Sequence, residues 1–267
     1  MSIDNICNLQ CKICTSYFSS KLAPRDKFLG LPVHKKLEPN FRKFNNLDIA
    51  NLEWLKILGG EPLMTPNLEP FLDYIDEKAT TSNIVLELVT NGTVIPSPRV
   101  LEKLNRFKHI SLLVSLDAYD PSNDYQRFGS SYMTTFSNAR SLETLLSNSE
   151  LAFHSATSVI TANHLSKTLN HITKEHGYHM SIDFVRDPEY LSLSIAPPSF
   201  LGWVLDRNRD NHTAYRMIET VAANAKFSEL EWKALIEFIN KTDAYYNTNI
   251  KDYNPELYDQ LSGYLGR

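Results

Sequence analysis

Short apolar runs alternate with amphipathic stretches along the first two-thirds of the chain. There are six such runs, and the shortest, residues 2–6, lies directly before the first cysteine. Several of the other five are nearly continuous apolar runs, typical of parallel strands covered on both faces. The five span residues 52–58, 84–90, 110–116, 152–160 and 180–185. Because helical stretches separate them, the pattern predicts right-handed strand–helix–strand units and a parallel sheet.

The stretches between the runs carry the start signals and the spacing of helices. A Thr-Pro pair at residues 65–66 and a Ser-Pro pair at 97–98 each put a capping residue before a proline, the order favoured at a helix N-terminus. Apolar residues then recur at helical spacing, as they also do over 136–146 and 165–172. Gly177 follows the last of these stretches and is expected to end that helix.

The number of these units predicts the fold class. An eight-unit barrel takes about 250 residues, so six units need about 190. We therefore predict an α/β fold: a partial (β/α)6 TIM-like barrel over residues 1–189. From residue 190 helix signals dominate, notably at 214–226 and 228–240. Residues 190–267 are predicted to form a helical C-terminal extension.

Composition and charge exclude several classes of protein. The chain has 267 residues, 42% hydrophobic and 22% charged, which is typical of globular domains rather than fibrous or disordered chains. Its 27 basic and 31 acidic residues give a net charge of −4, which makes a nucleic-acid partner or an acidic membrane unexpected. No apolar run approaches the roughly 20 residues of a membrane span. No secretory signal pattern opens the chain, so we expect a cytoplasmic protein.

The cysteines carry more information than the rest of the composition. All three lie within eight residues, at Cys7, Cys11 and Cys14, and their odd number forbids complete disulfide pairing. Three thiolates at this spacing can ligate three irons of a [4Fe–4S] cube, which normally takes four cysteines, and would leave one iron open. His34 could instead complete a Cys3His zinc site.

A second motif, Gly-Gly-Glu-Pro at residues 59–62, follows the run at 52–58. Two glycines allow a close backbone approach to a ligand, and the carboxylate can accept a hydrogen bond from a cationic group. Taken alone, the glycines could simply form a turn. The cysteine loop, this motif, Thr-Asn-Gly at 90–92 and Ser-Leu-Asp at 115–117 all follow predicted strands. Sites in parallel barrels lie at these strand ends, so we predict that the four segments converge.

The two leading motifs resemble those of the radical S-adenosylmethionine (SAM) superfamily, over about residues 2–186. The wording is closest to the branch of SPASM and twitch-domain proteins, which includes peptide maturases. Asn8-Leu9 after the first cysteine and the segments at 90–92 and 115–117 carry that likeness. Members of the branch usually have further cysteines for auxiliary clusters, and this chain has none. The resemblance therefore implies a single cluster in a compact or truncated member, with helices, a partner or a missing segment in place of the auxiliary region.

The resemblance implies an enzyme with two cofactors, a [4Fe–4S] cluster and SAM. In the family the open iron chelates the amino and carboxylate groups of SAM, and one electron cleaves the sulfonium. The resulting 5′-deoxyadenosyl radical abstracts a hydrogen atom from the substrate. The resemblance assigns Cys7, Cys11 and Cys14 to the cluster, Gly59, Gly60 and Glu61 to the amino group, Ser115 and Arg127 to the carboxylate, Asp117 and Asn91 to polar contacts nearby, and Ile13 to the adenine.

Each assignment has a structural alternative. Ser115 and Asp117 could cap the following helix, Asn91 could only shape a turn, and Arg127 could be a surface residue. The histidines, among them the group between residues 164 and 179, show no metal-like spacing tied to a second motif and are expected to be structural or exposed.

The substrate is the least determined feature of the sequence. The resemblance favours a peptide-like substrate and an electron donor such as flavodoxin or ferredoxin. The alternatives are a nucleotide or small metabolite as the substrate, or a non-catalytic iron–sulfur or zinc-binding module. The Gly-Gly-Glu-Pro motif favours the enzyme, because a structural metal has no need of it.

Overall fold

The structure is a computed structural model that describes residues 2–37, 49–119 and 121–263. Its strands form one sheet in the order β1-β2-β3-β4-β5. β1 pairs in parallel with β2, and β2 in parallel with β3. The bounds are β1 (Trp54–Ile57), β2 (Val85–Thr90), β3 (His109–Ser115), β4 (Ser149–Thr157) and β5 (His179–Phe184). Each of the five longer apolar runs thus forms a strand, and the predicted mixed α/β partial barrel is confirmed.

The sixth predicted strand is reduced to one contact. Within the described residues, the run at 2–6 contributes a single parallel bridge, between Ser2 and Leu58. The carbonyl groups of Asp4 and Ile6 accept hydrogen bonds from the turn after β1: Gly60 N donates to Asp4 O at 3.2 Å and Glu61 N to Ile6 O at 2.7 Å. The side chain of Asp4 also accepts from Ile6 N. Because these groups bind a turn and each other, the run does not continue as a ladder.

Helices fill the rest of the described chain. The α-helices are α1 (Ala23–Leu29), α2 (Leu68–Lys78), α3 (Pro98–Leu104), α4 (Pro121–Gln126), α5 (Tyr132–Leu145), α6 (Leu165–Leu169), α7 (Pro198–Arg207), α8 (His212–Ala223), α9 (Glu229–Tyr246), α10 (Ile250–Tyr253) and α11 (Pro255–Leu261). A π-helical turn, η5 (Asn170–Glu175), continues α6. Short 3-10 helices are η1 (Ser20–Leu22), η3 (Thr81–Asn83), η4 (Ala162–His164), η6 (Glu189–Leu191) and η7 (Leu193–Ile195). No helix of the described residues is long and apolar enough to cross a membrane.

The chain divides into two compact units. The first comprises Met1–Gln10, Cys14–Ser115 and Met133–Ala152. The second comprises Cys11–Ile13, Leu116–Tyr132 and Phe153–Arg267. The cysteine loop is therefore shared, since its middle segment belongs to the second unit and its flanks belong to the first.

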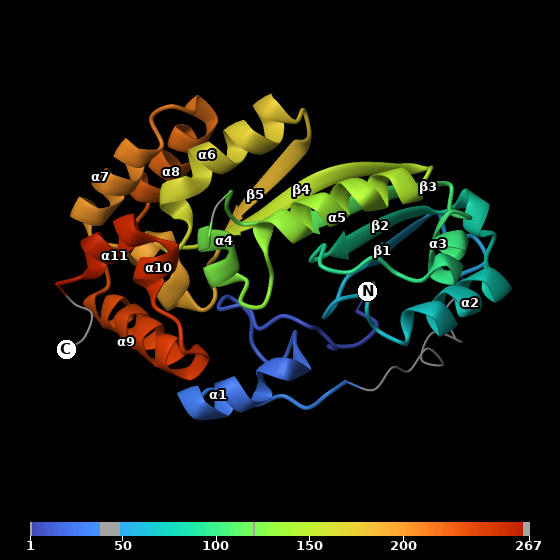
Figure 1. Cartoon of the computed structure of the whole chain (residues 1–267), viewed down its shortest axis with the longest axis horizontal. Helices are drawn as coiled ribbons and strands as arrows, with labels where there is room; N and C mark the ends of the chain where they lie inside the picture. The colour runs from blue at the N-terminus through green and yellow to red at the C-terminus, as the bar shows by residue number, and fades with distance from the viewer. Residues whose placement is uncertain (1, 38–48, 120, 264–267) are drawn as a thin grey trace. The chain divides into compact units, whose positions relative to one another are not determined.

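In the first unit, α2 and α3 lie side by side beside the strands β1 and β2 (Figure 1). The predicted apolar face of α2 is buried. That helix begins at Leu68, with Asn67 as the N-cap, and not at the predicted Thr65-Pro66 pair. The Thr65 hydroxyl donates instead to Asp4 Oδ2 at 2.5 Å, which holds it in the preceding turn. The predicted start of α3 is confirmed, because the Ser97 hydroxyl accepts from the backbone of the first turn.

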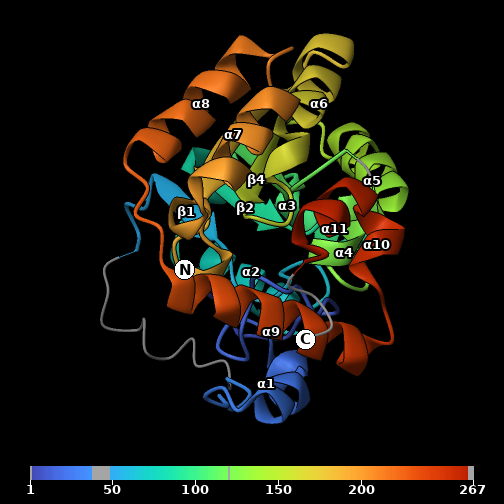
Figure 2. The ribbon, with the colours of Figure 1, turned by 90° about the vertical axis from the view of Figure 1, so that its left-hand side faces the viewer.

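In the second unit, α8 packs against both α6 and α7 (Figure 2). The helices predicted at 214–226 and 228–240 are present as α8 and α9. The N-cap of α9 is Ser228, whose hydroxyl accepts from Glu231 N at 3.3 Å. Gly177 follows η5 with a φ of +75°, the left-handed conformation expected of a residue that ends a helix.

Candidate functional site

The cysteine loop presents thiols, because none of its three cysteines forms a disulfide. Cys11 is buried, whereas Cys7 and Cys14 are half-buried. The sulfur of Cys7 faces two N–H donors: Leu9 N lies 3.4 Å from Sγ and Asn91 Nδ2 lies 3.8 Å from it. The same sulfur lies 4.0 Å from Asn8 Oδ1. N–H groups that point at a cysteine sulfur can also hydrogen-bond to it when it ligates a metal. The surroundings of Cys7 therefore suit a metal ligand.

The glycine motif packs on the segment that leads into the cysteine loop. A side chain at Gly60 would overlap the backbone of Asn5 and Ile6. Gly59 has a φ of +144°, and a side chain there would overlap Ser2 and Asp4. The close approach that these glycines permit is thus made to the chain's own backbone, and it fixes the residues just before Cys7.

Glu61 joins the turn after β1 to the end of β2. Its side chain is buried, with 1% of its surface exposed. One carboxylate oxygen accepts from Leu63 N at 3.0 Å and from the Thr90 hydroxyl at 2.7 Å. The other accepts from Asn91 N at 2.6 Å. The carboxylate is therefore held in place by the protein itself.

Asn91 links the end of β2 to the cysteine loop. Its amide donates to Asn8 Oδ1 at 2.9 Å, and Asn8 Nδ2 donates to Thr93 Oγ1 at 2.7 Å. Gly92 turns the chain with a φ of +69°. The turn predicted for the Asn-Gly pair is present, and its asparagine also contacts Cys7. The structure brings together Cys7, the Gly59–Glu61 turn and Asn91 within the first unit.

Asp117 and Arg127 form a buried ion pair in the second unit. Arg127 Nε lies 2.8 Å from Asp117 Oδ2, and Nη2 donates to Oδ1 at 3.0 Å. Asp117 also accepts from Gln126 Nε2 at 2.6 Å and from Ala156 N at 2.9 Å. The Asp117 carboxylate thus accepts three hydrogen bonds, and the contact with Nε is an ion-pair contact only. Asp117 therefore orients Arg127, and Arg127 is buried rather than on the surface.

The remaining predicted residues occupy strand and loop ends. Ser115 is the last residue of β3 and is half-buried in the first unit. Ile13 is half-buried in the second unit. The candidate set accordingly divides between the units: Cys7, Cys14, Gly59, Gly60, Glu61, Asn91 and Ser115 in the first, and Cys11, Ile13, Asp117 and Arg127 in the second.

Lys12, between the second and third cysteines, was not singled out by sequence reasoning. Its side chain is fully buried, and its ammonium donates to Thr242 Oγ1 at 3.0 Å. Asp243 Oδ1 lies 3.5 Å away, and the rings of Tyr125 and Tyr246 lie 4.0 and 5.1 Å from the ammonium. Lys12 N also donates to Gln126 O at 2.7 Å. These bonds tie the middle of the cysteine loop to α4 and to α9.

Tyr125 completes this cluster. Its hydroxyl donates to Asp243 at 2.8 Å. Burial, reinforced by the negative charge of Asp243, raises the pKa of Tyr125 well above its usual value. The phenol consequently stays neutral and remains a donor. The only sequence signal for the cluster was a lysine placed among ligand cysteines.

A second buried cation supports the other end of the loop. Arg25 Nη2 donates to Cys14 O at 2.5 Å and pairs with Asp26 Oδ1 at 2.6 Å. Asp26 Oδ2 in turn accepts from Ser16 N at 2.5 Å. The residues after Cys14 are therefore fixed by α1, a helix that the apolar pattern did not predict.

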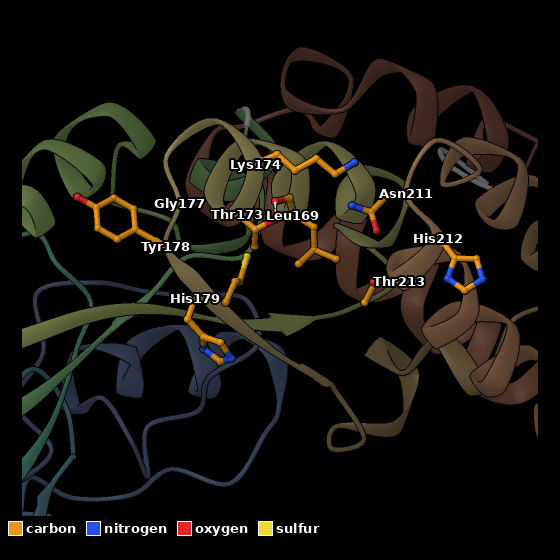
Figure 3. A pocket seen from close by; sticks show the side chains of 10 residues that line it. Leu169, Thr173, Lys174, Gly177, Tyr178, His179, Asn211, His212 and Thr213 are labelled. Carbon is orange, nitrogen blue, oxygen red and sulfur yellow. Dashed lines mark hydrogen bonds between the residues drawn. The ribbon is translucent and has the colours of Figure 1, made fainter.

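A pocket of about 560 Å3 lies elsewhere in the second unit. Residues from α6, η5, the start of β5 and α8 line it, and Figure 3 shows Lys174 extending toward Asn211 at its edge. Its volume falls in the range of small-molecule sites. None of the predicted site residues lines this pocket.

Comparisons with known proteins add family and fold. A family model described as the radical SAM superfamily matches residues 1–163. Native anSMEcpe with bound AdoMet (SAM) is 18% identical, with 84% of this chain and 62% of that chain covered and a TM-score of 0.56. The same protein with bound AdoMet and Kp18Cys peptide is also 18% identical, with 84% of this chain and 61% of that chain covered and a TM-score of 0.55. Streptococcus suis SuiB bound to S-adenosylmethionine is 15% identical, with 94% of this chain and 55% of that chain covered and a TM-score of 0.54.

These likenesses have a defined reach. At 15–18% identity they concern the fold. The chain spans between 55% and 62% of the length of these three structures. Among curated proteins there is no match.

Proposed function

We propose a reaction for this chain on the premise that it belongs to the radical SAM superfamily, whose family model matches residues 1–163 of its 267. It is a radical SAM enzyme, and its superfamily implies an iron–sulfur cluster and SAM. The proposed reaction is reductive cleavage of SAM at a [4Fe–4S] cluster held by Cys7, Cys11 and Cys14, followed by abstraction of a hydrogen atom from a substrate. In this proposal residues 1–189 form the catalytic barrel and residues 190–267 a helical extension.

The donor set fits such a cluster. Three thiols lie within eight residues, and the sulfur of Cys7 faces two N–H donors. This contact of Cys7 with Asn91, on a loop fixed by the Gly59–Glu61 turn, is the observation that carries the proposal. When bound, the cluster would supply the electron for SAM cleavage. Three cysteine ligands would leave its fourth iron open to SAM.

For the methionine amino group we propose Gly59, Gly60 and Glu61. The Glu61 carboxylate is positioned by the Thr90 hydroxyl and the amide of Asn91, so it does not have to be ordered when SAM binds. A pre-positioned buried carboxylate binds a cation with little loss of side-chain entropy.

For the carboxylate of SAM we propose Arg127 and Ser115. A guanidinium matches a carboxylate in shape and charge. Asp117 is a positioning residue here, because it accepts a hydrogen bond from Nη2 and forms a close ion pair with the Arg127 guanidinium. Asn91 orients the thiol of Cys7, and we propose the Ile13 side chain for the adenine.

We propose a peptide-like substrate and a small electron-transfer protein such as flavodoxin or ferredoxin as the reductant. The support for the peptide is the fold likeness to anSMEcpe with bound AdoMet and Kp18Cys peptide, at a TM-score of 0.55. A nucleotide or small metabolite remains the second candidate. Deuterium transfer from labelled peptide or nucleotide pools into 5′-deoxyadenosine would separate the two.

The decisive experiment is anaerobic reconstitution with iron and sulfide, followed by dithionite and SAM. We expect 5′-deoxyadenosine from the intact chain and none from Cys11→Ala. A chain that binds one zinc tightly and never cleaves SAM would overturn the proposal.

Glu61 calls for a paired test. Glu61→Gln keeps the acceptor for Asn91 N but loses the charge, and we expect weaker SAM binding with iron content unchanged. Glu61→Ala removes both and is expected to disturb the turn at Asn91 as well. Loss of iron in both variants would mean that Glu61 serves only to build the loop.

A further inference from the structure

Three potential metal ligands meet at the C-terminal end of η5, in the second unit: two lie on η5 and the third is its C-cap residue. His171, Glu175 and His176 each offer one ligand atom, and these atoms lie within 4.8 Å of one another. His171 Nδ1 lies 2.8 Å from Glu175 Oε2, and the two imidazole rings are 4.6 Å apart between centroids. All three belong to the histidine-rich stretch that sequence spacing led us to treat as structural or exposed.

The π-helical turn explains why spacing concealed this cluster. In an α-helix, residues i and i+4 are neighbours, but residue i+5 has turned away. A π-helix forms its hydrogen bonds from i to i+5 and so brings the fifth residue back to the same face. Helical turns of this kind occur frequently at functional sites. The wider turn aligns His176 with His171 and Glu175.

The three side chains of the cluster differ in how far they are exposed to solvent. The His171 side chain is only 12% exposed. Its ring packs on that of Tyr119 at 4.0 Å between centroids, and Tyr132 lies beyond at 5.9 Å. Glu175 is 64% exposed and His176 is also exposed. One ligand is therefore held by aromatic packing while solvent reaches the other two, an arrangement that suits an incoming ion.

The negative charge of Glu175 reaches this aromatic packing. The pKa of Tyr132 is raised by burial, by Tyr119 and by Glu175. A surface His–Glu pair four residues apart, such as His171 and Glu175, stabilises a helix by only about 0.2–0.5 kcal/mol. Helix stability alone therefore does not account for His176 beside this pair.

We propose that His171, Glu175 and His176 form a binding site for a divalent ion of the zinc type, built without any residue of the cysteine loop. Two imidazole nitrogens and one carboxylate oxygen are a donor set typical of zinc and related borderline ions. Three protein ligands leave a fourth position for water, so the site would be open rather than closed. This site is independent of the proposed SAM chemistry.

Zinc titration of the cluster-loaded full chain, in a chelator-buffered solution followed by calorimetry, tests the proposal. We expect one zinc per chain, with binding weakened by about tenfold or more in His171→Asn, Glu175→Gln and His176→Gln. His179→Gln, an exposed histidine on β5, is the matched control and should bind as the parent chain does. His176 is exposed, so His176→Gln keeps the test valid if His171→Asn fails to fold.

The cysteines need their own control, because thiolates also bind zinc. In a chain with Cys7, Cys11 and Cys14 all changed to serine, we expect the zinc to remain and cobalt substitution to give no sulfur charge-transfer band. Unchanged affinity in His176→Gln and Glu175→Gln would overturn the proposal. So would loss of the zinc in the cysteine variant alone. Neither outcome bears on SAM cleavage, which is measured separately.

Discussion

Replacement of Lys12 by methionine removes a buried charge while keeping most of the side-chain volume. In the folded chain the ammonium binds Thr242 Oγ1, faces the Tyr125 ring at 4.0 Å and lies 3.5 Å from Asp243 Oδ1. We expect Lys12→Met to destabilise the second unit and to loosen the segment between Cys11 and Cys14. The first effect lowers the free energy of unfolding, and the second lowers the iron content.

The size of the first effect follows from these contacts. The charged hydrogen bond to Thr242 contributes about 1.5–3 kcal/mol, and the cation–π contact with Tyr125 about 2 kcal/mol where water is excluded. Removing an ammonium also relieves a desolvation cost of several kcal/mol, so the net loss is smaller than this sum. We expect about 2 kcal/mol, or roughly 30-fold in the unfolding equilibrium.

Asp243 limits the damage. Its side chain is 14% exposed, so its charge is not wholly desolvated. It also keeps three donors after the substitution: the Tyr125 hydroxyl at 2.8 Å, the Thr248 hydroxyl at 2.8 Å and Ile250 N at 2.9 Å. The loss should therefore fall below the 3–5 kcal/mol typical of breaking a fully buried pair.

The assay is urea unfolding of the cluster-free chain, with iron per chain measured after parallel reconstitution. Lys241→Met is the matched control, since Lys241 precedes Thr242 on α9. Its side chain is 46% exposed and pairs with Glu237 on the surface. A surface pair contributes about 1 kcal/mol at most. If Lys12→Met and Lys241→Met unfold at the same free energy and hold equal iron, the reasoning is refuted.

Three further predictions concern a glycine, a tyrosine and an aspartate. Gly60→Ala puts a methyl group into the carbonyl of Ile6, so iron incorporation should collapse, while Gly202→Ala, with open space around it, should load normally; equal iron in both would contradict the packing. Because the pKa of Tyr125 is raised in the folded state, stability should be unaffected below about pH 10 and fall above it, where the unfolded phenol ionises first. Urea unfolding across that range should show a shallower fall in Tyr125→Phe, and equal slopes would argue against the shift. Asp117→Asn should cost about 3 kcal/mol in unfolding free energy, because its guanidinium partner is left buried without a counter-charge; a loss below 1 kcal/mol would mean that the pair is not buried in solution.

The strands and helices could be predicted because their signals are local. An apolar run and a Ser-Pro pair act through neighbouring residues, and β2 and α3 lie where the sequence placed them. The predicted first strand was wrong for a non-local reason: Asp4 and Ile6 give their carbonyl groups to a turn more than fifty residues away. The cap at Thr65 was wrong for the same reason, since its hydroxyl binds Asp4.

The polar contacts of the candidate site were less accessible to sequence reasoning. The motifs identified Cys7, Glu61 and Asn91 as candidates, and the structure places Asn91 in contact with both Glu61 and Cys7. The partners of Lys12 lie 230 and 231 residues away, and no local pattern specifies such a pair. The η5 cluster needs a wide helical turn that no apolar period indicates.

The attachment of Lys12 to α9 also bears on the order in which the protein is made. The cysteines leave the ribosome before Gly60, Glu61 and Asn91 do. Thr242 and Asp243, which bind Lys12, follow it by 230 and 231 residues. The loop therefore cannot reach its final conformation until α9 has been made. We expect iron to be loaded only after α9 has been made, and shorter nascent chains to expose the three thiols on a flexible segment.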